Sequence, residues 1–197
     1  MARLRRVWSP PHFHHVVSRG NWRDYLFKDD QDFLAFIYIL DHVHQGTKFE
    51  ICSYCLMGNH FHLMLRSEKV PLSTVMRKIN KSYADYYNTR YSVSGHLFEK
   101  RYFSKPIYDS LGLLEVSRYI HMNPVEANIS NSPQDYKWSS YTLFSSRIKH
   151  PNFFNPAPIH SLFPGKTPSK QKKHYCAWMK DDFKLFSLKN SGDRHPT

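Results

Sequence analysis

The stretch that decides the fold lies at residues 56–65 and reads Leu56-Met57-Gly58-Asn59-His60-Phe61-His62-Leu63-Met64-Leu65. Gly58-Asn59 is typical of a turn or bulge, and the apolar residues around it predict a strand on each side. Because side chains alternate between the two faces of a strand, His60 and His62 are expected on the same side. Two adjacent imidazoles flanked by apolar residues can chelate a metal ion, but two half-buried histidines on a sheet face fit this pattern about equally well.

Strands and helices alternate on either side of this hairpin. Strands are expected at 13–18, 49–54 and 61–65, with a strand or extended loop within 96–108. Apolar residues at helical spacing predict helices at about 30–45, 71–90 and 110–123, the last of them ended by Pro124. The order β-α-β-β-α-β-α predicts an α+β fold in which an antiparallel sheet carries helices on one face.

The character of the chain changes after residue 145. Residues 146–197 hold six of the twelve prolines and show weak periodicity until a basic helix becomes plausible near 169–186. We therefore expect one domain over residues 1–145 and a basic, proline-containing C-terminal appendage over 146–197.

Composition narrows the class of partner. The 197 residues carry a formal net charge of +12, with a pI of about 9.6. Such a basic balance points to a polyanionic partner, of which nucleic acid is the commonest. An aromatic content of 16% excludes a wholly disordered chain, and three cysteines exclude a disulfide-rich secreted scaffold.

The sequence favours a cytoplasmic protein without a membrane partner. The basic start resembles a signal peptide, but Pro10, Pro11 and His12 stand where the apolar run should follow. No stretch approaches the roughly 18 apolar residues that a spanning helix requires.

A zinc site competes with the two-histidine interpretation. Cys52 and Cys55 precede His60 and His62, which gives two cysteines followed by two histidines. A structural zinc site needs its cysteines on a tight knuckle, whereas here they lie in a strand pattern that would place them on opposite faces. Ordinary packing cysteines are therefore the better interpretation.

Tyr119 and Asn123 are four residues apart in the predicted helix that ends near Pro124, so they share one of its faces. Taken alone, a tyrosine and an asparagine near a helix end usually serve packing and capping.

An ordered set of motifs nevertheless resembles a known family. These motifs are Ser18-Arg19-Gly20-Asn21, the stretch from Leu56 to His62, Gly95-His96-Leu97-Phe98-Glu99-Lys100-Arg101-Tyr102, Tyr119-Ile120-His121-Met122-Asn123-Pro124-Val125 and Trp138-Ser139-Ser140-Tyr141. Together they resemble the single-tyrosine HUH transposases of small bacterial insertion sequences, and most closely the REP-associated tyrosine transposases. The resemblance covers roughly residues 8–145. One departure is that the insertion-sequence branch usually has glutamine where this chain has Asn123, whereas asparagine followed by proline matches the REP-associated branch.

The resemblance implies a ferredoxin-like HUH endonuclease fold and a DNA strand-transferase. Tyr119 would be the nucleophile that forms a 5′-phosphotyrosine intermediate, and His60, His62 and Asn123 would bind Mg²⁺ or Mn²⁺. The substrate would be single-stranded or hairpin DNA at palindromic repeats, and the protein a monomer or homodimer in the bacterial nucleoid. The alternative is a DNA-binding regulator that has kept the fold and lost the chemistry. An RNA-binding ferredoxin-like domain fits less well, because the paired aromatic strand signature is missing.

Basic and aromatic residues are the candidates for DNA contacts, although a solvated basic surface explains any one of them about as well. The candidates are Arg19, Arg23, Lys78, Tyr86, Lys100, Arg101, Lys105 and Arg118.

Overall fold

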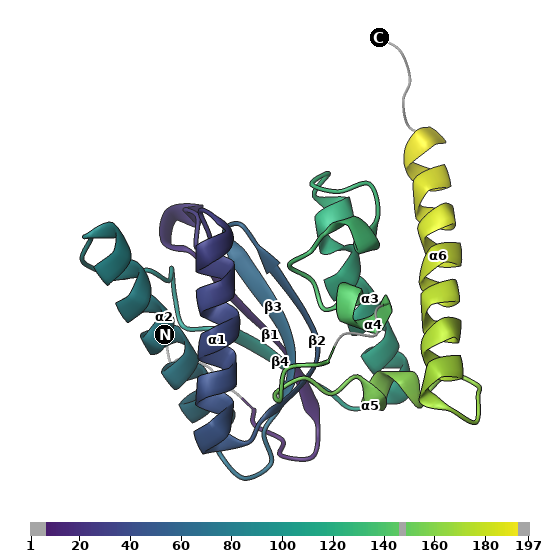
Figure 1. Cartoon of the computed structure of the whole chain (residues 1–197), viewed down its shortest axis with the longest axis horizontal. Helices are drawn as coiled ribbons and strands as arrows, with labels where there is room; N and C mark the ends of the chain where they lie inside the picture. Colours follow the sequence, from purple (N-terminus) through teal and green to yellow (C-terminus); the bar gives the residue numbers. More distant parts are fainter. Residues whose placement is uncertain (1–6, 146–148, 193–197) are drawn as a thin grey trace.

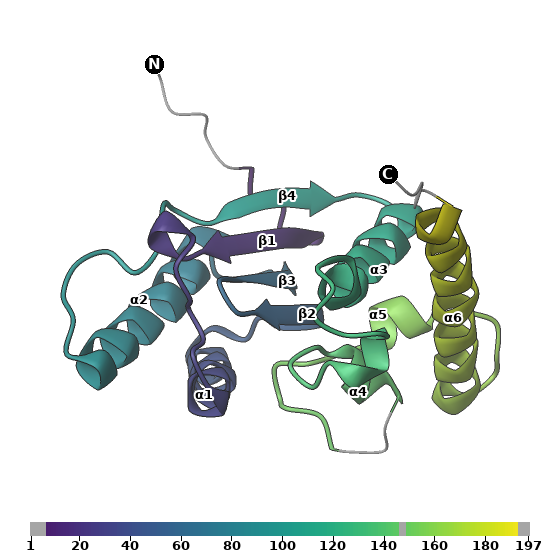
Figure 2. The ribbon, with the colours of Figure 1, turned by 90° about the horizontal axis from the view of Figure 1, so that it is seen from above.

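The computed structural model describes residues 7–145 and 149–192. Its core is a four-stranded antiparallel sheet in the order β2-β3-β1-β4 (Figure 2). The strands are β1 (Phe13–Arg19), β2 (Glu50–Met57), β3 (His60–Arg66) and β4 (Phe103–Ile107). The predicted α+β class and the antiparallel hairpin around Gly58-Asn59 are thereby confirmed.

Three helices follow the predicted order: α1 (Asp30–Thr47), α2 (Leu72–Tyr91) and α3 (Ser110–Glu126). After them come α4 (Tyr141–Ser145), α5 (Ala157–His160) and α6 (Pro168–Gly192). Two 3₁₀ turns, η1 (Asn21–Arg23) and η2 (Pro133–Asp135), complete the order. Asp29 caps α1, since its side chain accepts hydrogen bonds from the backbone N–H groups of Gln31 and Asp32.

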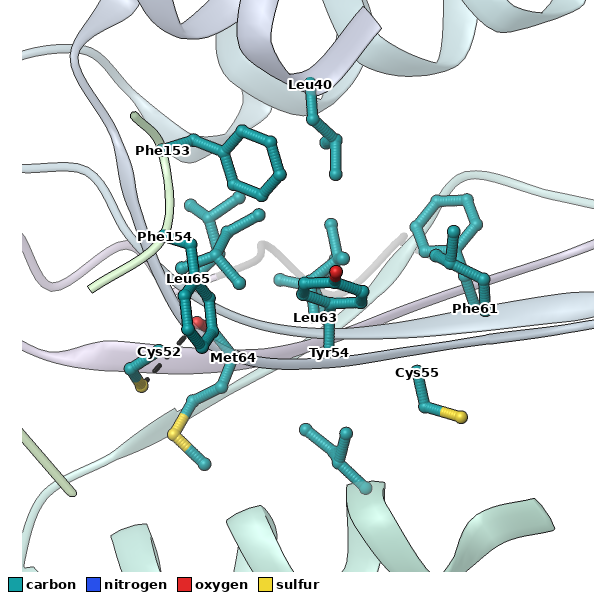
Figure 3. Packing of buried hydrophobic residues seen from close by; sticks show 14 of the residues in the cluster. Leu40, Cys52, Tyr54, Cys55, Phe61, Leu63, Met64, Leu65, Phe153 and Phe154 are labelled. Atoms are coloured by element: carbon teal, nitrogen blue, oxygen red, sulfur yellow. Dashed lines mark hydrogen bonds between the residues drawn. The ribbon is translucent and has the colours of Figure 1, made fainter. Parts of the chain in front are cut away.

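Helices cover both faces of the sheet, and not one face as the sequence predicted. Figures 1 and 2 show α1 and α2 on one side and α3 on the other. In Figure 3, Tyr54 and Leu63 project towards Leu40 of α1, while Cys55 and Met64 project to the opposite side. The burial of β2 agrees with helices on both faces, because its residues 51–57 are all buried, as expected for a strand that is covered on both sides.

Pro124 does not end α3, which continues to Glu126. Proline costs the helix one hydrogen bond, but the next turn closes because the N–H of Ala127 donates to the carbonyl of Asn123 at 3.0 Å. The N–H of Ile129 also donates to the carbonyl of Pro124 at 2.8 Å. Tyr119 and Asn123 therefore lie on one continuous helix.

The segment after residue 148 packs against the sheet and α3. The N–H of Ile51 donates to the carbonyl of Phe153 at 2.8 Å, and both Phe153 and Phe154 are buried. Further along, the hydroxyl of Tyr175 on α6 lies 2.9 Å from Oγ of Ser117 and 2.6 Å from Nδ1 of His121. The proposed boundary at residue 145 stays a prediction.

Within the described residues, none of the helices combines the length and the apolar character that crossing a bilayer requires.

Acid is expected to destabilise this packing through His160. Burial, with Lys172 and His150 nearby, lowers the pKa of His160 to about 4. As the pH falls below about 6.5, the imidazole of His160 takes up a proton in the unfolded chain but stays neutral in the folded protein. The free energy of unfolding therefore falls as the pH drops from 6.5 towards 4, by up to about 1.4 kcal/mol per pH unit. Thermal unfolding as a function of pH should show a shallower slope for His160→Gln. The exposed His42 is the control: His42→Gln should keep the wild-type slope.

Candidate active site

Four side chains from two elements meet on the α3 face of the sheet. His60 and His62 project from β3 with ring centres 4.9 Å apart. From α3, the ring of Tyr119 stands edge-on to His62 at 5.4 Å, and the side chain of Asn123 lies close enough to His60 to influence its pKa. The structure therefore brings together all four residues that the resemblance singled out, and their chemical roles stay predictions.

Hydrogen bonds orient both imidazoles of β3. The side-chain oxygen of Asn59 lies 2.7 Å from Nδ1 of His60, which fixes the hydrogen on that nitrogen. Nε2 of His62 is buried and has no hydrogen-bond partner. Burial lowers the pKa of His60 and lowers that of His62 well below its usual value. Two neutral imidazoles with an orphaned nitrogen fit a divalent metal ion, with the amide oxygen of Asn123 beside them.

His15 on β1 belongs to the site and was missed by the sequence analysis. Its Nε2 lies 3.0 Å from Nδ1 of His62, and the two rings stack at 5.2 Å. Burial, with a contribution from Lys105, lowers the pKa of His15 to about 4, so the neutral ring can accept the Nδ1 hydrogen of His62 and leave Nε2 of His62 for a metal. Alternation along β1 places His15 on the same face as Arg19, but the adjacency of β1 and β3 was not readable from the sequence.

A cavity of about 380 Å³ opens in front of these rings. It is lined by His15, Val17, Ser18, Arg19, His62, Glu99, Lys100, Arg101, Phe103 and Tyr119. Three predicted DNA-contact residues, Arg19, Lys100 and Arg101, thus face the tyrosine. Lys105 lies in β4, close enough to His15 to contribute to the lowering of its pKa. Arg118 is half-buried on α3 beside Tyr119. Arg23 lines a neighbouring cavity together with Arg19 and Lys100.

Lys78 and Tyr86 lie outside this site, because α2 covers the opposite face of the sheet. The hydroxyl of Tyr86 donates to the Asp32 carboxylate at 3.1 Å and accepts from Arg90 at 3.0 Å. Its ring stacks on that of Tyr83 at 5.7 Å. These contacts give Tyr86 a structural part in joining α1 and α2.

Cys52 and Cys55 are buried packing residues of the described hydrophobic core, the interpretation that the sequence favoured. The prediction that they face opposite sides of the sheet is wrong: both lie on the same side (Figure 3), because a bulge between Ile51 and Ser53 breaks the regular alternation. Cys55 is fully buried, which raises its pKa and disfavours a thiolate. Over residues 7–145 and 149–192, no group of three or more histidine, cysteine or acidic side chains is arranged to hold a metal ion.

The family model described as "Transposase IS200 like" matches residues 11–123, which is more than half of the chain. The chain belongs to the IS200-like transposase family. The match runs from just before β1 to Asn123 and so includes every residue of the site. The resemblance to the single-tyrosine transposases is confirmed.

Two solved structures are similar to this transposase. One is described as the structure of the REP-associated tyrosine transposase bound to a REP hairpin; it is 18% identical, with a TM-score of 0.65 over 79% of this chain and 92% of that chain. This match shows a shared fold. The other is the crystal structure of a putative transposase from Deinococcus radiodurans R1, 14% identical, with a TM-score of 0.43 over 61% of this chain and 95% of that chain. No curated protein matches the chain.

Removing the ring nitrogens of His15 should weaken metal binding. In His15→Phe the Nδ1 hydrogen of His62 loses its acceptor, and loss of such outer partners typically lowers metal affinity about 10- to 100-fold. Calorimetric titration with Mn²⁺ measures the effect. His12→Phe is the matched control, since the His12 ring packs on Tyr108 and not on His62. An unchanged affinity in His15→Phe would show that His15 does not orient His62.

Proposed function

We propose that this transposase is a metal-dependent DNA strand-transferase that cleaves and rejoins single-stranded or hairpin DNA through a 5′-phosphotyrosine intermediate. The observation that carries the proposal is the position of Tyr119, whose ring meets both His62 and His15, at 5.4 and 5.7 Å, at a cavity lined by cationic side chains. The similar REP-associated protein, which is described as bound to a REP hairpin, supports hairpin DNA as the substrate class.

His60, His62 and Asn123 would hold the metal ion, Mg²⁺ or Mn²⁺. When bound, the ion supplies positive charge that stabilises the charge developing on the non-bridging oxygens of the phosphate. Asn59 and His15 keep the two imidazoles in place by their hydrogen bonds to Nδ1. The burial that keeps both rings neutral also keeps them available as ligands.

Tyr119 would attack the phosphorus of the scissile phosphodiester after losing its phenolic proton. The bond between its oxygen and phosphorus forms, and the bond from phosphorus to the 3′ oxygen breaks. The leaving oxygen takes up a proton and becomes a free 3′-hydroxyl. Because the tyrosyl link is itself a phosphodiester, the 3′-hydroxyl of another strand can reverse the step and rejoin the DNA.

The cations around the cavity would bind the phosphates on either side of the cleaved bond. Arg19, Lys100 and Arg101 line the cavity itself, and Arg23 and Lys105 lie next to it. Phosphate contacts of this kind position a strand without reading its sequence.

The experiment is a cleavage assay on a labelled hairpin with a single-stranded extension. With Mn²⁺ or Mg²⁺ we expect a shortened strand with a free 3′-hydroxyl and a protein–DNA adduct that survives denaturing electrophoresis. Tight binding with neither product in either metal would favour the alternative, a regulator that binds palindromic repeats without cleaving them.

A further inference from the structure

Trp22 is the most exposed large apolar side chain in the described part of the protein, at 87% of its full accessible area. It lies in η1, directly after β1, and is neither part of the described hydrophobic core nor one of the partly buried residues packed against that core. A tryptophan left in water is unusual, because burying its ring is one of the largest stabilising contributions available to a side chain.

The backbone of this turn is held in a costly conformation. Trp22 has φ 52° and ψ 18°, and Arg23 has φ 63°, so two consecutive residues with side chains lie in the left-handed region. Gly20 is needed where the turn begins, because a Cβ there would lie 2.2 Å from the carbonyl oxygen of Asp24. Such strain persists only where the surroundings enforce it.

The surroundings that enforce it are the hairpin that carries His60. The N–H of Gly20 donates to the carbonyl of Asn59 at 2.9 Å, and the side-chain nitrogen of Asn59 donates to the carbonyl of Arg23 at 3.2 Å. The other end of the Asn59 side chain hydrogen-bonds His60. A single side chain thus ties the turn that presents Trp22 to an imidazole of the site.

Trp22 also lines a cavity that adjoins the active site. This cavity measures about 520 Å³ and is lined by Arg19, Asn21, Trp22, Arg23, Glu99 and Lys100. Arg19, Glu99 and Lys100 line the cavity in front of Tyr119 as well. The two cavities therefore adjoin along Arg19, Glu99 and Lys100, and the ammonium of Lys100 lies 3.8 Å from the carboxylate of Glu99.

We propose that Trp22 is a stacking platform for one unpaired base of the DNA strand, next to the phosphodiester that Tyr119 attacks. This inference rests on the proposed function and adds the recognition of a single-stranded nucleotide to it. Every base presents a π face to an indole, while Arg19, Arg23 and Lys100 match the adjoining phosphates. Three cations and one carboxylate, that of Glu99, line this cavity together with Trp22, and the net positive charge favours a nucleotide over an apolar protein partner or a lipid.

The test measures binding in a Tyr119→Phe background, in which the DNA stays uncleaved. Fluorescence anisotropy compares a hairpin that has a single-stranded extension with the same hairpin cut blunt. Loss of a stacked base corresponds to roughly 5- to 150-fold in affinity, so Trp22→Ala should bind the extended hairpin at least about fivefold more weakly. Its affinity for the blunt hairpin should not change, and Trp22→Phe should keep most of the affinity for the extended one. Tyr38→Ala is the control, since Tyr38 is 72% exposed on α1, across the sheet from the site.

Abasic nucleotides locate the stacked base. The nucleotides of the extension are replaced by abasic ones, one position at a time. At one position the replacement should weaken binding to the parent protein, which keeps Trp22, and should have no further effect on binding to Trp22→Ala. The stacking role is overturned if no position behaves in this way, or if Trp22→Ala lowers the affinity for the blunt hairpin as much as for the extended one. Either result leaves the proposal that the protein binds DNA intact. If the parent binds neither hairpin, the proposed function fails and this inference fails with it.

Discussion

Tyr119→Phe should abolish DNA cleavage and the covalent adduct, a loss of at least about a thousandfold in rate. The substitution removes one oxygen atom, which is the atom proposed to bond to phosphorus. The side chain is 43% exposed, so the fold and the thermal stability should be almost unchanged. Binding should persist, because affinity comes from phosphate contacts and stacking. Denaturing electrophoresis of the labelled hairpin measures both products.

Tyr108→Phe is the matched control for this loss. Tyr108 lies in the connection between β4 and α3 and is 64% exposed, and its ring packs on His12. This variant should cleave at the wild-type rate. If Tyr119→Phe still forms the adduct, another tyrosine is the nucleophile. Tyr86 and Tyr91 of α2 are poorly placed for this role, because both hydroxyls donate to the carboxylate of Asp32 on the far side of the sheet.

The parts of the site that follow from local periodicity were predictable from the sequence. The two-residue repeat of a strand places His60 and His62 on one side, and the helical repeat places Tyr119 and Asn123 on one face. Neither repeat requires knowledge of the rest of the fold. Bringing the two pairs together relied on the family resemblance, since spacing alone does not say where α3 packs.

The parts that depend on neighbours in space were not predictable. His15 contacts His62 because β1 lies beside β3, and strand order is a property of the whole sheet. Tyr86 was expected to stack on an unpaired base of the DNA, but α2 covers the face away from Tyr119. The bulge at Cys52 likewise depends on the register between β2 and β3 and not on the cysteine pattern.

The contacts of the C-terminal segment were also not predictable from the sequence. Its weak periodicity gave little basis for predicting contacts, yet Tyr175 of α6 is completely buried and bonded to Ser117 and His121 of α3. These bonds lie within one helical turn of Tyr119 and Asn123. The helix that carries the proposed nucleophile is therefore held between the sheet and the C-terminal helix, through polar contacts that hydrophobic patterning does not reveal.

His62→Ala should reduce cleavage at least about a hundredfold at a fixed, low concentration of Mn²⁺, because it removes a metal ligand while Tyr119 stays in place. Titration with Mn²⁺ should show weaker binding, and raising the Mn²⁺ concentration should restore part of the cleavage. No concentration should rescue Tyr119→Phe, since that variant lacks the attacking atom. This difference separates the two roles, although the two rings lie 5.4 Å apart.

Removing the metal from the wild-type protein provides the corresponding comparison. Treatment with EDTA should stop cleavage while leaving hairpin binding in place, and added Mn²⁺ should restore it. His42→Ala, on the exposed surface of α1, should behave as wild type throughout. Undiminished cleavage by the EDTA-treated protein would contradict the metal role of His60, His62 and Asn123.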